Sequence, residues 1–361
     1  MKFFCSILLC LLILSCSTKV PQLPDKSMSK VERMEKYLSD FEKAGFSGSV
    51  LVAEKGEILL RKGYGESDQG KGVPNKPETI FDMGSISKQF TAAAILKLEM
   101  QGRLKVEDKA SKFLPELDGQ RKDITIHQLL THTAGLPDAL GSDEELISRK
   151  DYFQRLNGRN LLQAAGEKHL YSNIGYTLLA LIIEEQGGMR YEDFLRKELF
   201  LPSRMEQTGY ILPEWKTDEM AHGYRNNTDT GLPTEQNWDK DGPGLHLKGN
   251  GGLLSNVDDM YKWHLALSGE KILSEAAKKK FYTRHTPEEG GRTFYGYGWA
   301  IFPTRWDSEL ITHNGGNGIF FADFLRFIEE DVCIIFFTNA GNRDVERIAF
   351  RLARVMFEEK Y

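Results

Sequence analysis

Cysteine is scarce in this chain of 361 residues, which contains only four. Three of the four lie within the first sixteen residues, and the fourth, Cys333, lies in an apolar run. Cleavage before Cys16 would leave only Cys16 and Cys333, so no disulfide framework is available. The fold must therefore be held by its apolar core, and a chain of this length that is 40% hydrophobic can bury a large one.

An excess of positive charge is also missing. The formal net charge is -5, and no long basic run creates a local exception. Both observations argue against binding to nucleic acid through bulk electrostatics. The expected partner is a small molecule or a peptide.

Several catalytic and metal-binding motifs are absent from the sequence. There is no His-Glu-x-x-His helix and no set of paired cysteine ligands, so no metal site is predicted. No Gly-Lys-Ser/Thr completes a phosphate-binding loop, and no Gly-x-Ser-x-Gly elbow indicates an α/β-hydrolase. We therefore expect chemistry that needs no cofactor.

A hydrophobic run long enough to span a membrane is not found at the amino terminus. Residues 3–14 are apolar and follow Lys2, but they are too few for a membrane-spanning helix and are typical of an export signal, here residues 1–15. Ile13-Leu14-Ser15-Cys16 resembles the bacterial lipobox. We therefore expect lipidation of Cys16 and anchoring to a membrane of the cell envelope, on the periplasmic side or at the cell surface; an ordinary cleaved signal is the alternative. Residues 16–28 suit a tether.

The folded domain is predicted over residues 29–361. Apolar residues at helical spacing predict a helix over residues 29–44, and the segments that flank Lys55-Gly56 predict a hairpin of two strands. Four more strands and a final helix are predicted near the carboxyl end. These strands are residues 299–302, 310–313, 320–327 and 332–338. The two ends of the chain are expected to share one sheet.

A mainly helical middle separates the two ends. Its predicted helices are residues 89–100, 126–130, 176–185, 191–199 and 258–267. The fold class is therefore α+β, an antiparallel β-sheet flanked by N- and C-terminal helices with an inserted helical subdomain. The α/β part is expected over about residues 29–83 and 286–361, and the helical part over about residues 84–285. Residues 212–252 are rich in Gly, Pro, Asn and Asp and are expected to wall a pocket.

A serine hydroxyl needs a base to become a nucleophile, so a serine with a lysine one helical turn away is a candidate. Three pairs have this spacing: Ser27 with Lys30, Ser85 with Lys88, and Ser268 with Lys271. Ser85 is the best placed, because it opens an alanine-rich helix whose free amides favour developing negative charge. The alternative is that Ser85 only caps this helix and Lys88 is solvated.

Tyr171-Ser172-Asn173 is a second candidate, at the start of another apolar helix. A tyrosine with a lowered pKa could relay the serine proton, which requires a nearby cation such as Lys88. Tyr224-Arg225-Asn226 has the same spacing, and a buried structural tyrosine is the alternative.

His313-Asn314-Gly315-Gly316 ends a predicted strand and is the third candidate. Glycines at this place let an acyl group lie against the strand edge, and the Gly316 amide can join the Ser85 amide in an oxyanion hole. A glycine turn with a surface histidine is the alternative.

Together these residues resemble the class C β-lactamase family, whose relatives include D,D-peptidases, D-amino-acid-specific peptidases and esterases. Further segments support the resemblance in the same order along the chain: Phe46-Ser47-Gly48-Ser49-Val50, Leu129-Leu130-Thr131-His132-Thr133-Ala134-Gly135-Leu136-Pro137, Gly251-Gly252-Leu253-Leu254-Ser255 and Tyr295-Gly296-Tyr297-Gly298-Trp299. The resemblance implies that Ser85 attacks a carbonyl while Lys88 and Tyr171 manage its proton. It also implies that Asn173 positions the substrate and that water releases the acyl group.

The chain departs from the typical β-lactamase at one substrate-binding segment. It has His313-Asn314-Gly315 in place of Lys-Thr/Ser-Gly, and a mostly neutral imidazole should bind a substrate carboxylate less firmly than lysine does. We therefore expect an exported serine hydrolase that acts on small esters or D-amino-acid peptides of the peptidoglycan type. A true β-lactamase is the alternative within this chemistry. A non-catalytic penicillin-binding or cell-wall-sensing protein, or a purely structural envelope protein, is the alternative from another class.

Overall fold

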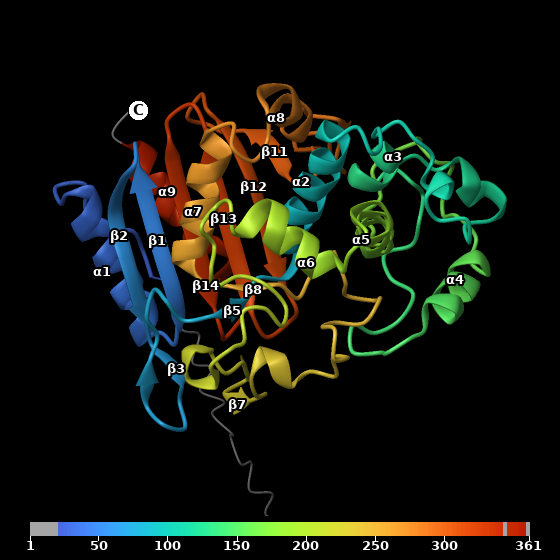
Figure 1. Cartoon of the computed structure of the whole chain (residues 1–361). Helices are drawn as coiled ribbons and strands as arrows, with labels where there is room; N and C mark the ends of the chain where they lie inside the picture. Colours follow the sequence, from blue (N-terminus) through green and yellow to red (C-terminus); the bar gives the residue numbers. More distant parts are fainter. Residues whose placement is uncertain (1–20, 342–344, 359–361) are drawn as a thin grey trace, which may run out of the picture.

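The computed structural model describes residues 21–341 and 345–358, which build an eight-stranded antiparallel sheet with helices on both faces (Figure 1). The strand order is β2-β1-β14-β13-β12-β11-β10-β9. These strands are β1 (Gly48–Glu54), β2 (Glu57–Tyr64), β9 (Thr286–Pro287), β10 (Phe294–Tyr295), β11 (Ala300–Pro303), β12 (Glu309–Gly316), β13 (Phe321–Phe327) and β14 (Val332–Thr338). The prediction that the two ends of the chain share one sheet is confirmed.

The pairing of β1 with β14 joins the two ends of the chain. The register runs from Gly48 opposite Thr338 to Glu54 opposite Val332, and both strands are almost entirely buried. Their sequences are nearly continuous apolar runs rather than alternating ones, because helices cover both faces of the sheet. Removing this apolar area from water contributes roughly 25 cal/mol per Å².

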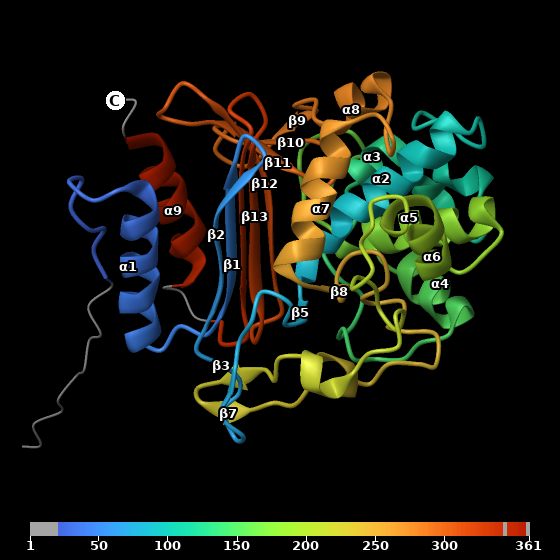
Figure 2. The same ribbon diagram turned by 60° about the vertical axis from the view of Figure 1, so that its left-hand side comes forward.

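One face of the sheet is covered by the two terminal helices, α1 (Lys30–Lys43) and α9 (Ile348–Phe357), which contact each other (Figure 2). A capping box starts α1: the Ser29 hydroxyl accepts the Glu32 N–H, and the Glu32 carboxylate accepts the Ser29 N–H. Leu38 and Leu352 belong to the apolar layer between these helices and the sheet. The predicted flanking helices are confirmed.

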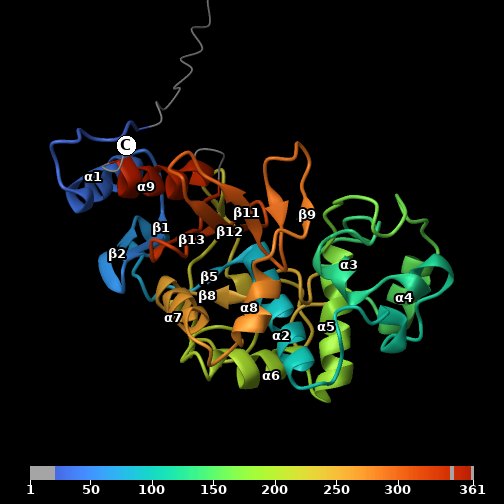
Figure 3. The same cartoon turned by 90° about the horizontal axis from the view of Figure 1, so that it is seen from above.

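The opposite face is covered by α7 (Val257–Ser268), which packs on β1 and β14. Seen from above, α2 (Ser87–Met100) lies between the sheet and α5 (Asn173–Gly187) (Figure 3). Both α2 and α5 are buried on nearly all sides, which is typical of helices inside a larger core. The other α-helices of the described residues are α3 (Ile126–Leu130), α4 (Arg149–Asn157), α6 (Tyr191–Leu195) and α8 (Glu275–Phe281).

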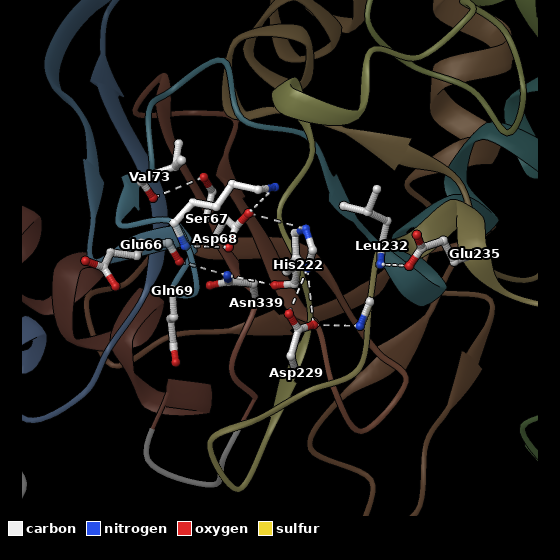
Figure 4. Close-up of polar contacts among 12 residues, drawn as sticks. Glu66, Ser67, Asp68, Gln69, Val73, His222, Asp229, Leu232, Glu235 and Asn339 are labelled. Atoms are coloured by element: carbon white, nitrogen blue, oxygen red, sulfur yellow. Dashed lines mark hydrogen bonds and ion pairs between the residues drawn. The ribbon is translucent and has the colours of Figure 1, made fainter.

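Three short ribbons lie outside the main sheet. They pair β3 (Glu66–Asp68) with β4 (Val73–Pro74), β5 (Phe81–Asp82) with β8 (Leu254–Ser255), and β6 (Tyr224–Arg225) with β7 (Thr228–Asp229). Figure 4 shows how the β6–β7 ribbon is attached to the sheet: Asn339 Nδ2 donates to Glu66 O (3.0 Å) and to His222 O (2.9 Å). The His222 imidazole in turn contacts the Asp229 and Asp68 carboxylates. The part of the segment 212–252 around residues 222–229 is therefore tied to the end of the sheet.

Two predictions for the amino terminus lie outside the described residues. They are the export signal over residues 1–15 and the lipidation of Cys16. Within the ranges that the structure covers, no helix is long and apolar enough to cross a bilayer.

Candidate active site

Ser85 lies in a 3-10 turn, Gly84–Ile86, which follows β5 and runs directly into α2. Its side chain is half-buried and does not cap α2, because no side-chain capping bond is made at that helix start. Gly84 has a φ of +51°, and a Cβ there would lie 2.5 Å from Gly316 N. The turn therefore requires glycine before Ser85, both for its conformation and for close contact with β12.

Lys88 is fully buried one turn after Ser85. Its Nζ lies 3.0 Å from Ser85 Oγ, 2.7 Å from Asn173 Oδ1 and 2.8 Å from Asn250 O. Burial lowers the pKa of Lys88 to about 7, although Asp138 and Asp143 favour its charged form. The structure thus contradicts the solvated lysine of the alternative reading and places a potential base beside Ser85.

Tyr171 lies against Lys88, whose Nζ is 4.8 Å from the centre of the tyrosine ring. Burial raises the pKa of Tyr171 above its ordinary value, and a hydrogen bond with Ser85 only partly offsets this rise. The expected lowering of the Tyr171 pKa is therefore wrong, because the desolvation of the phenolate outweighs its hydrogen bond with Ser85. Tyr171 is protonated near neutral pH, and Lys88 is the better proton acceptor.

Asn173 is the first residue of α5 and links Lys88 to a carboxylate. Its Oδ1 accepts the Lys88 bond, and its Nδ2 donates to Asp138 Oδ1 at 3.0 Å. Ser172 caps the same helix by accepting the Gly175 N–H, and the bonds to Lys88 and Asp138 hold the Asn173 side chain in place. The structure brings Asn173 to Ser85, and its contact with substrate stays a prediction.

The glycines of β12 bring that strand into backbone contact with the Ser85 turn. A Cβ on Gly315 would lie 2.1 Å from Met83 O and 2.5 Å from Ser85 N, so a side chain cannot be accommodated there. β12 is an interior strand over its first half, but β11 begins at Ala300, opposite Thr312, and leaves the end of β12 uncovered on that side. An open strand edge thus lies directly beside Ser85.

The Gly316 amide points toward this open side. Gly316 is opposite Phe321 of β13, and the next pair is joined by a bond from Asn317 N to Phe320 O at 3.3 Å. In an antiparallel ladder, successive N–H groups of one strand point to opposite sides. The Gly316 N–H therefore points away from β13, as the predicted oxyanion hole with the Ser85 N–H requires.

His313 is buried in β12, and both of its ring nitrogens have partners within the protein. Nε2 lies 3.0 Å from the Tyr295 hydroxyl, and Nδ1 lies 2.6 Å from Asn314 O. Burial lowers the pKa of His313 to about 3, and the Lys88 charge acts in the same direction. The imidazole is therefore neutral, and the surface histidine of the alternative reading is wrong. A role for His313 in substrate binding stays a prediction.

Comparisons with known proteins agree with this geometry. The beta-lactamase family model matches residues 32–355. The chain belongs to the beta-lactamase family. Penicillin-binding protein 4* of Bacillus subtilis is 31% identical over 342 residues, which cover 89% of this chain and 74% of that protein.

Two solved structures share the fold of this beta-lactamase family member. A penicillin-binding protein homologue from Pyrococcus abyssi matches with a TM-score of 0.76 and 26% identity, over 91% of this chain and 77% of that one. A penicillin binding protein from Bacillus halodurans matches with a TM-score of 0.74 and 23% identity, over 90% and 99% of the two chains. The predicted family and fold class are confirmed. Proteins of the family are generally serine hydrolases.

Three residues of this family member's site were not assigned a role from the sequence. Asn250 contributes its backbone carbonyl to Lys88, the His132 ring packs at a tilt against the Tyr171 ring with ring centres 4.2 Å apart, and Tyr295 bonds His313. His132 and Tyr295 lie in two segments that carried the family resemblance, so their positions were marked although their contacts were not. A backbone carbonyl such as that of Asn250 leaves no signal in residue type.

The competing motifs do not form comparable sites. Lys30 pairs with Glu54, Ser268 Oγ donates back to His264 O in its own helix, and the Tyr224 hydroxyl accepts the Gln69 N–H. Among the residues that the structure covers, no group of three or more His, Cys, Asp or Glu side chains is arranged to hold a metal ion.

Proposed function

We propose that this chain is a serine acyl-hydrolase that works through an acyl-enzyme at Ser85. One observation carries the proposal: Lys88 is fully buried, and its Nζ lies 3.0 Å from Ser85 Oγ. In the described part of the chain this ammonium group forms no ion pair, and burying an unpaired charge costs several kcal/mol. A lysine with a pKa of about 7 is an efficient general base at neutral pH. Proton transfer therefore explains why the Lys88 amine is buried despite the cost in stability.

Acylation starts with neutral Lys88. Its Nζ accepts the Ser85 hydroxyl proton while Ser85 Oγ bonds to the substrate carbonyl carbon, and the carbonyl oxygen becomes an oxyanion that accepts the Ser85 and Gly316 N–H bonds. When the carbonyl re-forms, the bond to the leaving group breaks. Protonated Tyr171 gives its proton to the leaving group and takes one back from the Lys88 ammonium, so both groups return to their starting forms.

Deacylation repeats these steps with water in place of Ser85. Neutral Lys88, through Tyr171, accepts a proton from water as the water oxygen bonds to the acyl carbon. Collapse of the second oxyanion breaks the bond to Ser85 Oγ, which regains the proton. The products are a free acid and the unmodified enzyme.

The charges around the site favour neutral acyl groups over anionic ones. His313 is neutral, and the Asp138 carboxylate is bonded to Asn173 at the start of α5. A carboxylate on the substrate thus meets no fixed cation from β12. We therefore propose small esters or D-amino-acid peptides as substrates, and penicillins as slow acylating ligands. The likeness to proteins named penicillin-binding proteins supports the proposal that penicillins acylate the site.

We also propose that the enzyme is exported and anchored to a membrane through lipid on Cys16. The support is the apolar segment over residues 3–14 and the lipobox-like sequence that ends at Cys16. Radiolabelled palmitate should appear in the wild-type protein and not in Cys16→Ser. Equal labelling of both proteins would overturn this part of the proposal.

Turnover measurements test the catalytic proposal. The substrates are a p-nitrophenyl ester, a D-alanine p-nitroanilide and a penicillin, and the control is Ser268→Ala, which alters a serine with the same Ser-x-x-Lys spacing. We expect Ser85→Ala to lose about a thousandfold or more in kcat/KM for the ester, and Ser268→Ala to lose nothing. Wild-type turnover by Ser85→Ala would contradict the proposal. A stable adduct at Ser85 with no turnover of any substrate would favour a non-catalytic binding protein.

A further inference from the structure

Asp82 is a buried carboxylate next to the candidate nucleophile that has no cationic partner. Its side chain belongs to a residue that is 3% exposed, and among the described residues no lysine, arginine or histidine forms an ion pair with it. Burial raises the pKa of Asp82 to about 6. A buried, unpaired carboxylate is costly for stability, so its position calls for another purpose.

The two oxygens of Asp82 hold the two segments that carry the proposed oxyanion hole. Oδ1 accepts the Gly84 N–H at 2.7 Å, and Oδ2 accepts the Asn317 Nδ2 at 2.9 Å. Gly84 directly precedes Ser85, and Asn317 directly follows Gly316. One carboxylate therefore connects the neighbours of both amide donors.

The direction of the second bond is fixed by the loop that follows β12. Asn317 Oδ1 accepts the Ile319 N–H at 3.0 Å and the Phe320 N–H at 2.9 Å, so its amide nitrogen must face Asp82. The acceptor of this link is at position 82 and the donor is at position 317. This polarity makes the link testable by exchange of the two side chains.

We propose that Asp82 is a positioning residue that fixes the Ser85 amide and the Gly316 amide relative to each other. At the contact itself the facing residues are Gly84 and Gly315, which have no side chains to keep the turn and the strand aligned. The Asp82–Asn317 link supplies that alignment from just outside the contact. Because the oxyanion is absent from the bound substrate and develops only on the way to the tetrahedral intermediate, misplacing its donors should lower kcat more than it raises KM. This inference rests on the proposed acyl-hydrolase function.

Exchange of the two side chains tests the inference. Asp82→Asn leaves one acceptor for two donors, so the new amide can accept the Gly84 N–H or the Asn317 Nδ2 but not both, and Asn317→Asp places two carboxylates in contact. In the double variant Asp82→Asn/Asn317→Asp, the amide introduced at position 82 donates to the carboxylate introduced at position 317, and the bonds from Gly84, Ile319 and Phe320 can all be kept. The variants are compared with the wild type by kcat and KM for the p-nitrophenyl ester. Thermal unfolding of each variant reports whether it is folded.

The inference predicts that each single variant loses about tenfold to a hundredfold in kcat with a smaller change in KM, and that the double variant recovers most of the loss. The control is Asp259→Asn, because Asp259 is also a buried, multiply bonded aspartate, but its bonds go to Gln207 and Thr208 and not to the Ser85 turn or the end of β12. Its kcat should stay at the wild-type value even if its melting temperature falls.

Two results would overturn the inference while the proposed function stands. One is an active wild type with unchanged kcat in both folded single variants. The other is a folded double variant whose kcat is no higher than that of the less active single variant. A wild type that neither hydrolyses the ester nor reacts with an acylating probe instead removes the proposed function, and the inference falls with it.

Discussion

Single residues decide what this site can do, and Lys88 decides most. Its Nζ has three acceptors, in Ser85, Asn173 and Asn250, and its pKa is lowered to about 7. An ammonium group satisfies all three with its protons, whereas the neutral amine keeps a lone pair for the Ser85 hydroxyl. The sequence predicted the Ser85–Lys88 pair from its spacing, but the loss of solvent that lowers the Lys88 pKa is a property of the folded core.

The lowered pKa of Lys88 sets a pH dependence. Below pH about 7 Lys88 is protonated and cannot accept a proton, so kcat/KM should rise with pH and level off above about pH 8. Lys88→Arg, which stays charged, should have little activity at any pH. A wild-type profile that is flat between pH 5.5 and 8, measured with a neutral ester whose own chemistry is corrected for, would contradict Lys88 as the base.

The neutral His313 sets a second prediction, on substrate choice. His313→Lys introduces the fixed charge that the site lacks, so acylation by an anionic penicillin should increase at least about tenfold relative to acylation by a neutral ester. His313→Gln is the matched control, because it is neutral and should leave the ratio of the two rates near the wild-type value. An equal change of the ratio in both variants would show that the charge at position 313 does not set substrate choice.

At the scale of elements, the candidate active site lies where the Ser85 turn, β12 and the start of α5 meet. Helical spacing and apolar runs predicted α1, α2, α5, α7 and the long strands to within a few residues. The strand that became β12 was predicted to end at residue 313. In the structure it continues to Gly316, because its pairing with β13 continues through the glycines. Backbone pairing between distant segments decides that boundary, and residue type does not reveal it.

His132, in the turn after α3, holds the segment that precedes α5. Its backbone oxygen accepts the Leu170 N–H at 2.7 Å, its Nδ1 accepts the Ser172 N–H at 3.0 Å, and its ring packs at a tilt against the intervening Tyr171. His132→Ala should therefore lower kcat about tenfold or more, because Tyr171 loses its support. His285→Ala is the control, because His285 stacks on Tyr297 with ring centres 4.2 Å apart. Equal kcat losses in the two variants, measured on folded protein, would sink this role for His132.

At the scale of the whole molecule, strands from both ends of the chain close one sheet, and a helical region inserted between them supplies Ser85, Lys88 and Tyr171. Strand-like apolar runs at both ends predicted this shared sheet. The pocket wall was less predictable. Residues 212–252 were expected to line the pocket, and while Asn250 does reach Lys88, His222 lies in a polar cluster at the end of the sheet. A segment without periodic apolar residues does not reveal where it packs.

The packing of α9 on one face of the sheet leads to a stability prediction. Leu352→Ala removes a fully buried side chain and should lower the free energy of unfolding by about 2–5 kcal/mol. Phe350→Ala, on the same helix but 40% exposed, should cost clearly less. Urea unfolding of both variants checks the difference, and a Leu352→Ala protein as stable as Phe350→Ala would show that α9 does not complete the core.

The most direct test of the central claim is intact-mass spectrometry of the protein after reaction with a fluorophosphonate, followed by peptide mapping. We expect one adduct, located on Ser85, that forms in the wild type and in Ser268→Ala and is absent from Ser85→Ala. An adduct on another serine, or no adduct at all on folded protein, would contradict the claim that Ser85 is the nucleophile of a serine hydrolase.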